Sequence, residues 1–266
     1  MNDRASTDLT PFVRRGVDAR DVVTLTLDRP QAFNSLSEGM LAALQAELDA
    51  IAADDNVRAV VIAAGGKAFS AGHDLKEMRA RPSQAYYEDL FARCARTMLT
   101  LQKLPVPVIA RVQGIATAAG CQLVAACDLA VAAKEARFAV SGVNLGLFCS
   151  SPCVALSRNV GRKAAFEMLV TGEFISADEA RERGLVNRVV AADALDAEVE
   201  KIVAAIVAKP RVAIALGKQL FYRQLETGTA AAYEDAGRTM ACNMMETATL
   251  EGVQAFIEKR KPDWQA

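Results

Sequence analysis

Short apolar runs alternate with amphipathic stretches through most of the chain. Four of the runs are rich in Val, Ile, Leu and Ala, which is typical of strands that are buried on both faces of a parallel sheet. The stretches between them carry apolar residues at helical spacing. This alternation predicts an α/β fold with strands at Val22–Leu27, Val57–Ala64, Val106–Val112 and Leu129–Ala133.

Polar capping residues mark where the helices begin. The Ser-x-x-Glu pattern at Ser176 and Glu179 is that of a capping box. After Ser83, apolar residues recur at helical spacing, so one face of that helix is expected to pack on the sheet. The predicted helices run from Ser35 or Ser37 to about Ala53, from Ser83 to Leu104, from Ala118 to Ala126, and from Ser176 to Gly184.

The character of the chain changes after Lys209-Pro210. From there on, long helical stretches follow one another without a strand pattern. We therefore predict an α/β core at residues 1–209 and a helical segment at residues 210–266.

The amino-acid composition limits which kinds of partner the chain is expected to bind. Of the 266 residues, 52% are hydrophobic, but no apolar run has the length needed to span a membrane. The 31 basic and 32 acidic residues leave a formal charge of −1 without blocks of like charge. This pattern predicts neither a nucleic-acid partner nor a membrane partner, so any anionic ligand must be bound by local groups.

The six cysteines form no C-x-x-C pair and the chain has one histidine. This favours buried, reduced thiols over a zinc site, and no metal is expected. The first eight residues contain early acids and no apolar core, so they resemble neither a secretory signal nor a transit peptide. These features predict a cytoplasmic protein.

Two small-residue turns stand out, at Lys67–Met78 and Gln113–Leu123. Each follows an apolar strand and opens a predicted helix. Backbone N–H groups at a helix start have no partner within the helix and can point at a developing negative charge. Because small side chains leave room for a ligand, the two turns are interpreted as the halves of an oxyanion hole.

The chain resembles the enoyl-CoA hydratase/isomerase (crotonase) superfamily from about residue 20 to the C-terminus. Several motifs in the same order carry this resemblance, together with the Phe-x-x-Lys-Arg-Lys tail that begins at Phe256. The motif segments are Leu27–Asn34, Phe69–Glu77, Gly114–Asp128 and Thr171–Val186.

The resemblance implies a crotonase-like spiral of β-β-α repeats that forms two sheets. It also implies that the C-terminal helical region at residues 210–266 assembles homotrimers or dimers of trimers and closes the coenzyme A pocket. The implied partner is an acyl-CoA thioester. Coenzyme A is then part of the substrate, and no permanently bound cofactor is expected.

By the same resemblance, the thioester carbonyl oxygen lies between the backbone N–H groups of Ala71 and Ala118. The remaining implied contacts are with coenzyme A. They come from Gln31, Ala32 and Phe33, from the segment Ala68, Ser70, Ala71, Gly72, His73, Asp74 and Leu75, and from Phe256 and Lys259 of a neighbouring subunit.

Two positions depart from the family pattern. Hydratases of the family hold and polarise a water with two glutamates, and here those positions are Gln122 and Gly142. A glutamine can orient a water but cannot take its proton, and a glycine has no side chain. His73 is a candidate acid–base group or a contact to coenzyme A, and Asp74 is a more natural helix cap than a base.

Three functions follow from this pattern. The first is an enoyl-CoA hydratase/isomerase-like enzyme, in the lyase class of fatty acid metabolism, with an altered mechanism. The second is a non-catalytic acyl-CoA binding or regulatory protein. The third is a thioester hydrolase in which His73, Asp74 or the loop around Cys149 supplies the chemistry.

Overall fold

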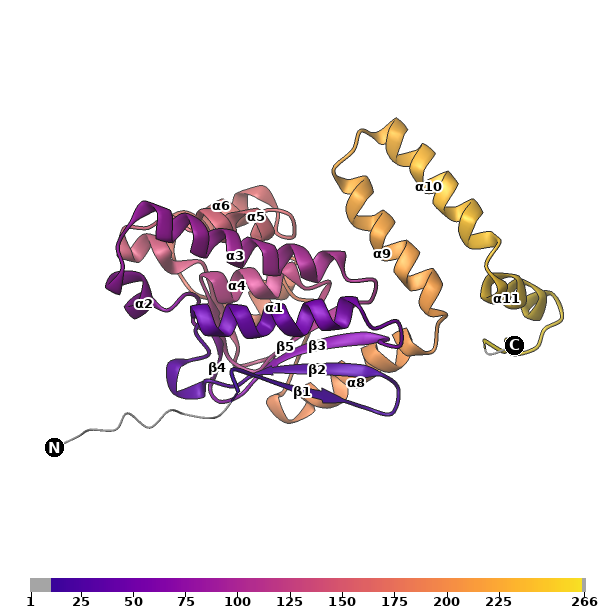
Figure 1. The fold of residues 1–266 in the computed structure, drawn as a ribbon, viewed down its shortest axis with the longest axis horizontal. Coiled ribbons are helices and arrows are strands. Elements are labelled where there is room, and N and C mark those ends of the chain that lie inside the picture. The colour runs from indigo at the N-terminus through magenta and orange to yellow at the C-terminus, as the bar shows by residue number, and fades with distance from the viewer. Residues whose placement is uncertain (1–10, 265–266) are drawn as a thin grey trace.

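Two sheets form the framework of the protein. The computed structural model describes residues 11–264, and Figure 1 shows the helices arranged around the sheets. The larger sheet has six strands in the order β1-β2-β3-β5-β7-β10, and the smaller has four in the order β4-β6-β8-β9. The strands are β1 Val13–Val17, β2 Val22–Leu27, β3 Ala59–Ala64, β4 Ala68–Ser70, β5 Val108–Val112, β6 Ile115–Thr117, β7 Leu129–Ala133, β8 Arg137–Ala139, β9 Ile175–Ser176 and β10 Arg188–Val190.

The larger sheet is parallel except for β1, which pairs antiparallel with β2. Every residue of β3 is buried, because helices cover both faces of a parallel sheet. On one face, α8 packs Leu195, Val199 and Ile202 against β3 and β7. The other face packs against the main hydrophobic core, to which α1, α3 and α4 contribute.

The α/β class predicted from the sequence is confirmed, and two of the predicted strands match the observed ones at both ends. The other two begin two residues later than predicted. Val57 belongs to a turn, with its N–H donating to Asp54 O at 3.4 Å. Pro107 has no N–H to donate to a sheet, so β5 begins at Val108.

Eleven α-helices occupy the described residues, and those predicted are present. Ser37 caps α1 by accepting the Met40 N–H, and Ser176 and Glu179 form the predicted capping box of α7. The bounds are α1 Glu38–Ala52, α2 Leu75–Ala80, α3 Gln84–Lys103, α4 Ala119–Ala126, α5 Ser150–Leu156, α6 Arg162–Thr171, α7 Ala177–Glu182, α8 Leu195–Val207, α9 Arg211–Leu225, α10 Thr229–Met244 and α11 Thr247–Ile257, with 3₁₀ turns at Pro30–Ala32, Ser141–Leu145 and Ala192–Ala194.

The helical C-terminal region is present as α9, α10 and α11, which lie beside the sheets and the other helices in orange to yellow (Figure 1). Within these three helices, Lys218 and Ala255 are the buried residues. Lys218 ties α9 to the core, since its Nζ donates to Asp128 Oδ2 at 2.6 Å and to the carbonyl oxygens of Leu101 and Val106.

Candidate functional site

A cavity of about 290 Å³ lies where the two predicted oxyanion turns meet the loop before α5. The first turn contributes Ala71 and His73, and the second contributes Ala118 and Ala119. The rest of the wall is largely apolar, which suits an acyl group. It comprises Leu75, Met78, Phe91, Ser141, Gly142, Leu145, Leu147, Phe148, Cys149, Ser150, Ser151 and Pro152.

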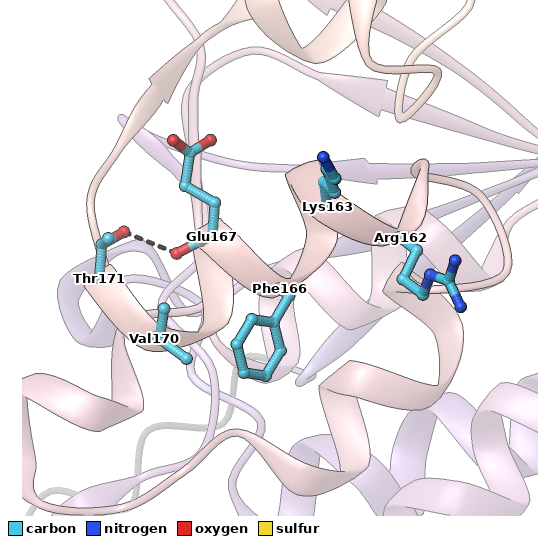
Figure 2. A pocket seen from close by; sticks show the side chains of 6 residues that line it. All are labelled: Arg162, Lys163, Phe166, Glu167, Val170 and Thr171. Atoms are coloured by element: carbon cyan, nitrogen blue, oxygen red, sulfur yellow. Dashed lines mark hydrogen bonds between the residues drawn. The ribbon is translucent and has the colours of Figure 1, made fainter.

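A second hollow, of about 560 Å³, lies along the outer face of α6. Figure 2 shows Phe166 and Val170 pointing to one side of this helix and Glu167 to the other, with Thr171 Oγ1 donating to the Glu167 carbonyl oxygen at 2.8 Å. Its lining residues include no thiol and no histidine. The reactive groups predicted from the sequence therefore belong to the first cavity.

Hydrogen bonds join the first turn to the segment at Gln31–Phe33. Ala71 N–H donates to Phe33 O at 3.0 Å, and the Asn34 amide donates to the carbonyl oxygens of Gly65 and Ala68. Ser70 Oγ donates to Asn34 O at 2.8 Å. These bonds bring together the two segments that were predicted to hold coenzyme A.

The second turn is shaped by an unusual backbone conformation at Ala118, with φ 50° and ψ −121°. This residue adopts positive φ although it is not glycine, and such strain is concentrated at functional sites. Its N–H donates to Ala139 O of β8 at 3.0 Å. The next residue, Ala119, begins α4 and is 1% exposed.

Gly72 brings the two turns into contact. Its φ of +86° favours glycine, and a Cβ there would lie 3.0 Å from Ala118 Cβ and 3.1 Å from Ala119 N. The residue after Gly72 is His73, which lines the same cavity as Ala119.

The predicted donors need correction. The N–H groups of Ala71 and Ala118 both donate to backbone carbonyls, so neither is available to a ligand. Within residues 11–264, the N–H groups of His73 and Ala119 donate to no protein acceptor. A buried N–H without a partner is uncommon in proteins. The available pair lies one residue later than predicted in the second turn and two residues later in the first.

The His73 imidazole is half-buried between Leu36 and Phe91. Its Nδ1 donates to Leu36 O at 3.2 Å, and its ring meets the edge of Phe91 at a centroid distance of 5.5 Å. Burial lowers the pKa of His73, which favours the neutral imidazole. The predicted capping role of Asp74 is confirmed, because its side chain accepts the N–H groups of Lys76 and Glu77 at the start of α2.

Neither position of the missing glutamates offers a proton acceptor. Gln122 is 4% exposed, and its Oε1 has no hydrogen-bond partner among the described residues. A Cβ on Gly142 would lie 2.5 Å from Leu147 O and 2.8 Å from Cys149 Sγ, so the loop leaves no room for a side chain there. None of the described residues that line the cavity is acidic.

Phe256 and Lys259 lie apart from the cavity in this chain. Phe256 belongs to α11 and is 85% exposed, and Lys259 follows that helix with a φ of 57°. In Figure 1, α11 lies at the opposite side of the molecule from α2. The predicted contact of these residues with coenzyme A was assigned to a neighbouring subunit and stays a prediction.

Several cavity residues escaped the sequence analysis. Phe91 lies at an apolar helical position, Met78 stood only as the end of the first turn, and Leu145 and Leu147 lie in a loop that has no periodic signal. Ala119 was not assigned a donor role, because the family resemblance was carried over to its neighbour Ala118. The signal that separates the two alanines is the positive φ of Ala118, which no sequence pattern encodes.

Comparisons with known proteins identify relatives of this chain. A sequence model described as enoyl-CoA hydratase/isomerase matches residues 18–266. The chain is 48% identical over 240 residues to the mitochondrial enoyl-CoA hydratase domain-containing protein 3 of Xenopus laevis, covering 90% of this chain and 82% of that protein. Its human counterpart is 42% identical over 261 residues, covering 98% and 86%.

The fold agrees with solved structures as well. A crystal structure of an enoyl-CoA hydratase from Mycobacterium smegmatis superposes with a TM-score of 0.96 and 69% identity, covering 97% of this chain and 100% of that one. The crotonase-like fold that the resemblance implied is thereby confirmed.

The predicted cytoplasmic location is contradicted by the comparison, because the relatives from Xenopus laevis and human are named as mitochondrial. The location of a protein in the cell is set by short targeting segments, and the hydrophobic pattern of its core does not reveal it. The prediction rested on residues 1–8, which lie outside the described residues. Among the described helices, none has both the length and the apolarity to cross a membrane.

Proposed function

Because this chain belongs to the enoyl-CoA hydratase/isomerase family, we propose that it is an acyl-CoA enzyme that polarises a thioester carbonyl. The carbonyl oxygen lies between the N–H groups of His73 and Ala119, and the acyl group fills the cavity beyond them. The observation that carries the proposal is this pair of unpartnered donors, held close together by Gly72 at the wall of an apolar cavity.

The two N–H donors suit reactions at the carbon atoms next to a thioester carbonyl. Removing a proton from C2 or adding a nucleophile to C3 of a 2-enoyl thioester places negative charge on the carbonyl oxygen. Fixed N–H donors stabilise that charge more than they stabilise the neutral carbonyl, and one such donor contributes about 3–4 kcal/mol to the transition state.

Coenzyme A is proposed to lie along Gln31–Phe33 and the backbone of Ala68–Leu75, which the Asn34 amide holds together. Phe33 is exposed, and so it can contact a ligand that lies on this surface. Phe256 and Lys259 of a second subunit complete the site in this proposal, and residues 210–266 assemble the homotrimer or dimer of trimers. Coenzyme A enters as part of the substrate, without a permanently bound cofactor.

The reaction is proposed to differ from hydration by paired glutamates. Gln122 and Gly142 provide no base, and the described cavity wall contains no carboxylate. His73 is the imidazole at the cavity, and its lowered pKa keeps it available as a neutral acceptor. Water addition therefore depends on His73 or on water held by Gln122, and it is expected to be slow.

A second candidate function is binding without turnover. The observation that favours it is the same absence of a carboxylate among the described cavity residues. A protein that only senses or carries acyl-CoA needs the pocket and the donors but no base.

Turnover in heavy-oxygen water distinguishes these functions. The purified protein is incubated with matched saturated and 2-enoyl CoA thioesters, products are read by mass spectrometry, and binding is measured by calorimetry. Heavy oxygen in a 3-hydroxyacyl-CoA supports the enzyme, whereas a labelled free acid would indicate a hydrolase. Binding without product supports the second function, and failure to bind any thioester would refute both.

A further inference from the structure

Cys149 places a thiol at the wall of the cavity. It directly precedes α5, it is 6% exposed, and its Sγ accepts the Gly142 N–H at 3.2 Å. Sγ also fills the space beside Gly142 that a side chain at that position would need. The thiol of Cys149 thus lies where a side chain at position 142 would otherwise lie.

Other groups show that the thiol faces a ligand site. The unpartnered N–H groups of His73 and Ala119 belong to the same cavity wall. Gln122, one turn into α4, is almost fully buried with an unpartnered Oε1. Helical side chains lean toward the helix N-terminus, so Gln122 leans toward Ala118 and Ala119. Buried polar groups without partners indicate a missing ligand or water.

The position of the thiol along the cavity indicates which ligand atom it meets. Ala118 N–H pairs with Ala139 O, whereas the thiol is held at Gly142, three residues further along the chain. A Cβ on Gly142 would lie 2.8 Å from Sγ, so the thiol takes the place of the second glutamate of the family pattern, which acts on the water that adds to C3. A carbonyl oxygen at the donors places C1 next to them and C3 of the acyl chain further into the cavity.

We propose that Cys149 captures 2-enoyl thioesters by reversible conjugate addition, an inference that rests on the proposed function. The thiol proton leaves to water, and Sγ forms a bond to C3. The C2–C3 π electrons move toward the carbonyl oxygen, which His73 and Ala119 hold, and C2 then takes a proton from water. Atoms and charge balance without an oxidant, and the product is a thioether that still contains coenzyme A.

The surroundings of the thiol make this addition selective for a ligand bound in the cavity. Burial raises the pKa of Cys149, while the hydrogen bond from Gly142 opposes that rise. The thiolate is the nucleophile, so general alkylation at neutral pH is suppressed. A thioester polarised by the two donors is a better electrophile than the same compound in water, and the cavity therefore promotes addition of its own ligand.

Intact-protein mass spectrometry tests the proposal. The full chain is incubated at mildly alkaline pH with a 2-enoyl-CoA or with the saturated thioester of equal length, and peptides are then mapped. We expect a mass gain equal to the whole enoyl-CoA on Cys149, and none with the saturated thioester. Cys149→Ser is expected to reduce labelling at least about tenfold, since a hydroxyl is a far weaker nucleophile than a thiol. Cys153→Ser, one turn later on α5 and outside the cavity wall, should label like the wild type.

Calorimetry on the same samples separates the two proposals. If both thioesters bind but no adduct forms, the capture by Cys149 is refuted and the proposed function stands. A mass gain of the acyl group alone, or an adduct on another cysteine, would also refute the capture. If neither thioester binds, the proposed function fails, and the capture fails with it.

Discussion

At the scale of single residues, Gly72 controls access to the proposed donors. Gly72→Ala would place a methyl group 3.1 Å from Ala119 N, where the thioester oxygen is expected to lie. We expect a loss of about 10²–10³ in turnover of any thioester substrate, comparable to removal of an oxyanion-hole donor. Steady-state kinetics and calorimetric binding measure the effect.

Gly184→Ala is the matched control for this substitution. Gly184 has a φ of +87°, and an added Cβ would lie 3.1 Å from Asn159 O, and neither residue belongs to the cavity wall. Both variants carry a similar backbone strain of about 1–3 kcal/mol. Equal losses of turnover in the two variants would show that strain, rather than obstruction of the donors, causes the effect.

The burial of His73 predicts how the stability of the fold depends on pH. Burial lowers the pKa of its imidazole in the folded protein, so the unfolded chain binds the proton more readily. Stability is therefore lost as the pH falls below about 6.5, the ordinary pKa of histidine. His73→Asn keeps a side-chain donor for Leu36 O but does not titrate in this range.

Chemical unfolding of both proteins between neutral and mildly acidic pH measures this difference. We expect the wild type to lose more unfolding free energy than His73→Asn on acidification. Parallel pH profiles would contradict the burial of His73 as a neutral group.

The sequence located both turns but not the donors within them. Small residues and apolar strands mark a turn, whereas the direction of each N–H depends on local φ and on contacts such as Ala71 N–H to Phe33 O. The same limit applies at Gly142. A glutamate restored there by substitution would collide with Leu147 O, a contact that becomes visible when the loop is folded.

At the scale of elements, local chemistry explains what was predictable. The runs at β2 and β7 are long and apolar enough to identify strands, and Ser37 and Ser176 fix helix starts through side-chain hydrogen bonds. The smaller sheet was missed as individual strands because β4, β6, β8 and β9 have two or three residues each. Such lengths carry no periodicity, and pairing with distant segments defines these strands.

The buried Lys218 is expected to stabilise the contact between α9 and the core. Its Nζ is buried against Asp128 Oδ2 at 2.6 Å, and Tyr222 OH donates to the other carboxylate oxygen at 2.7 Å. Lys218→Met would leave the Asp128 carboxylate without its cation. We expect the free energy of unfolding to fall by about 3–5 kcal/mol, as is typical when one partner of a buried pair is removed.

Arg96→Ala is the control for the loss of an ion pair. Arg96 Nη2 lies 3.0 Å from Asp49 Oδ2, with both side chains largely exposed. Such pairs contribute about 0–1 kcal/mol. Urea unfolding at a fixed protein concentration measures both variants, and similar losses would contradict a structural role for the Lys218–Asp128 pair.

At the scale of the whole molecule, the C-terminal helices α9, α10 and α11 bury few of their residues within one chain. Tyr233 and Met240 on α10, and Met245 directly after it, are each at least 70% exposed, and α10 buries none of its described residues. Single exposed apolar residues are ordinary, but α9 and α11 also expose several, among them Phe221, Leu250 and Phe256, and clusters of such residues mark contacts with other proteins. The sequence predicted helices in this region and could not show what covers them.

We predict that other copies of this chain cover the α10 surface in a homotrimer or a dimer of trimers. Burying an apolar side chain contributes about 1.5–3 kcal/mol, so a charge in its place weakens association by more than about tenfold at each interface. Met240→Glu with Met245→Glu should therefore shift the native mass toward the monomer, whereas Leu99→Glu on α3 should not. Native mass spectrometry and light scattering measure the assembly. A monomeric wild type would refute this arrangement, and it would also remove Phe256 and Lys259 from the proposed coenzyme A site because the cavity of one chain does not reach them.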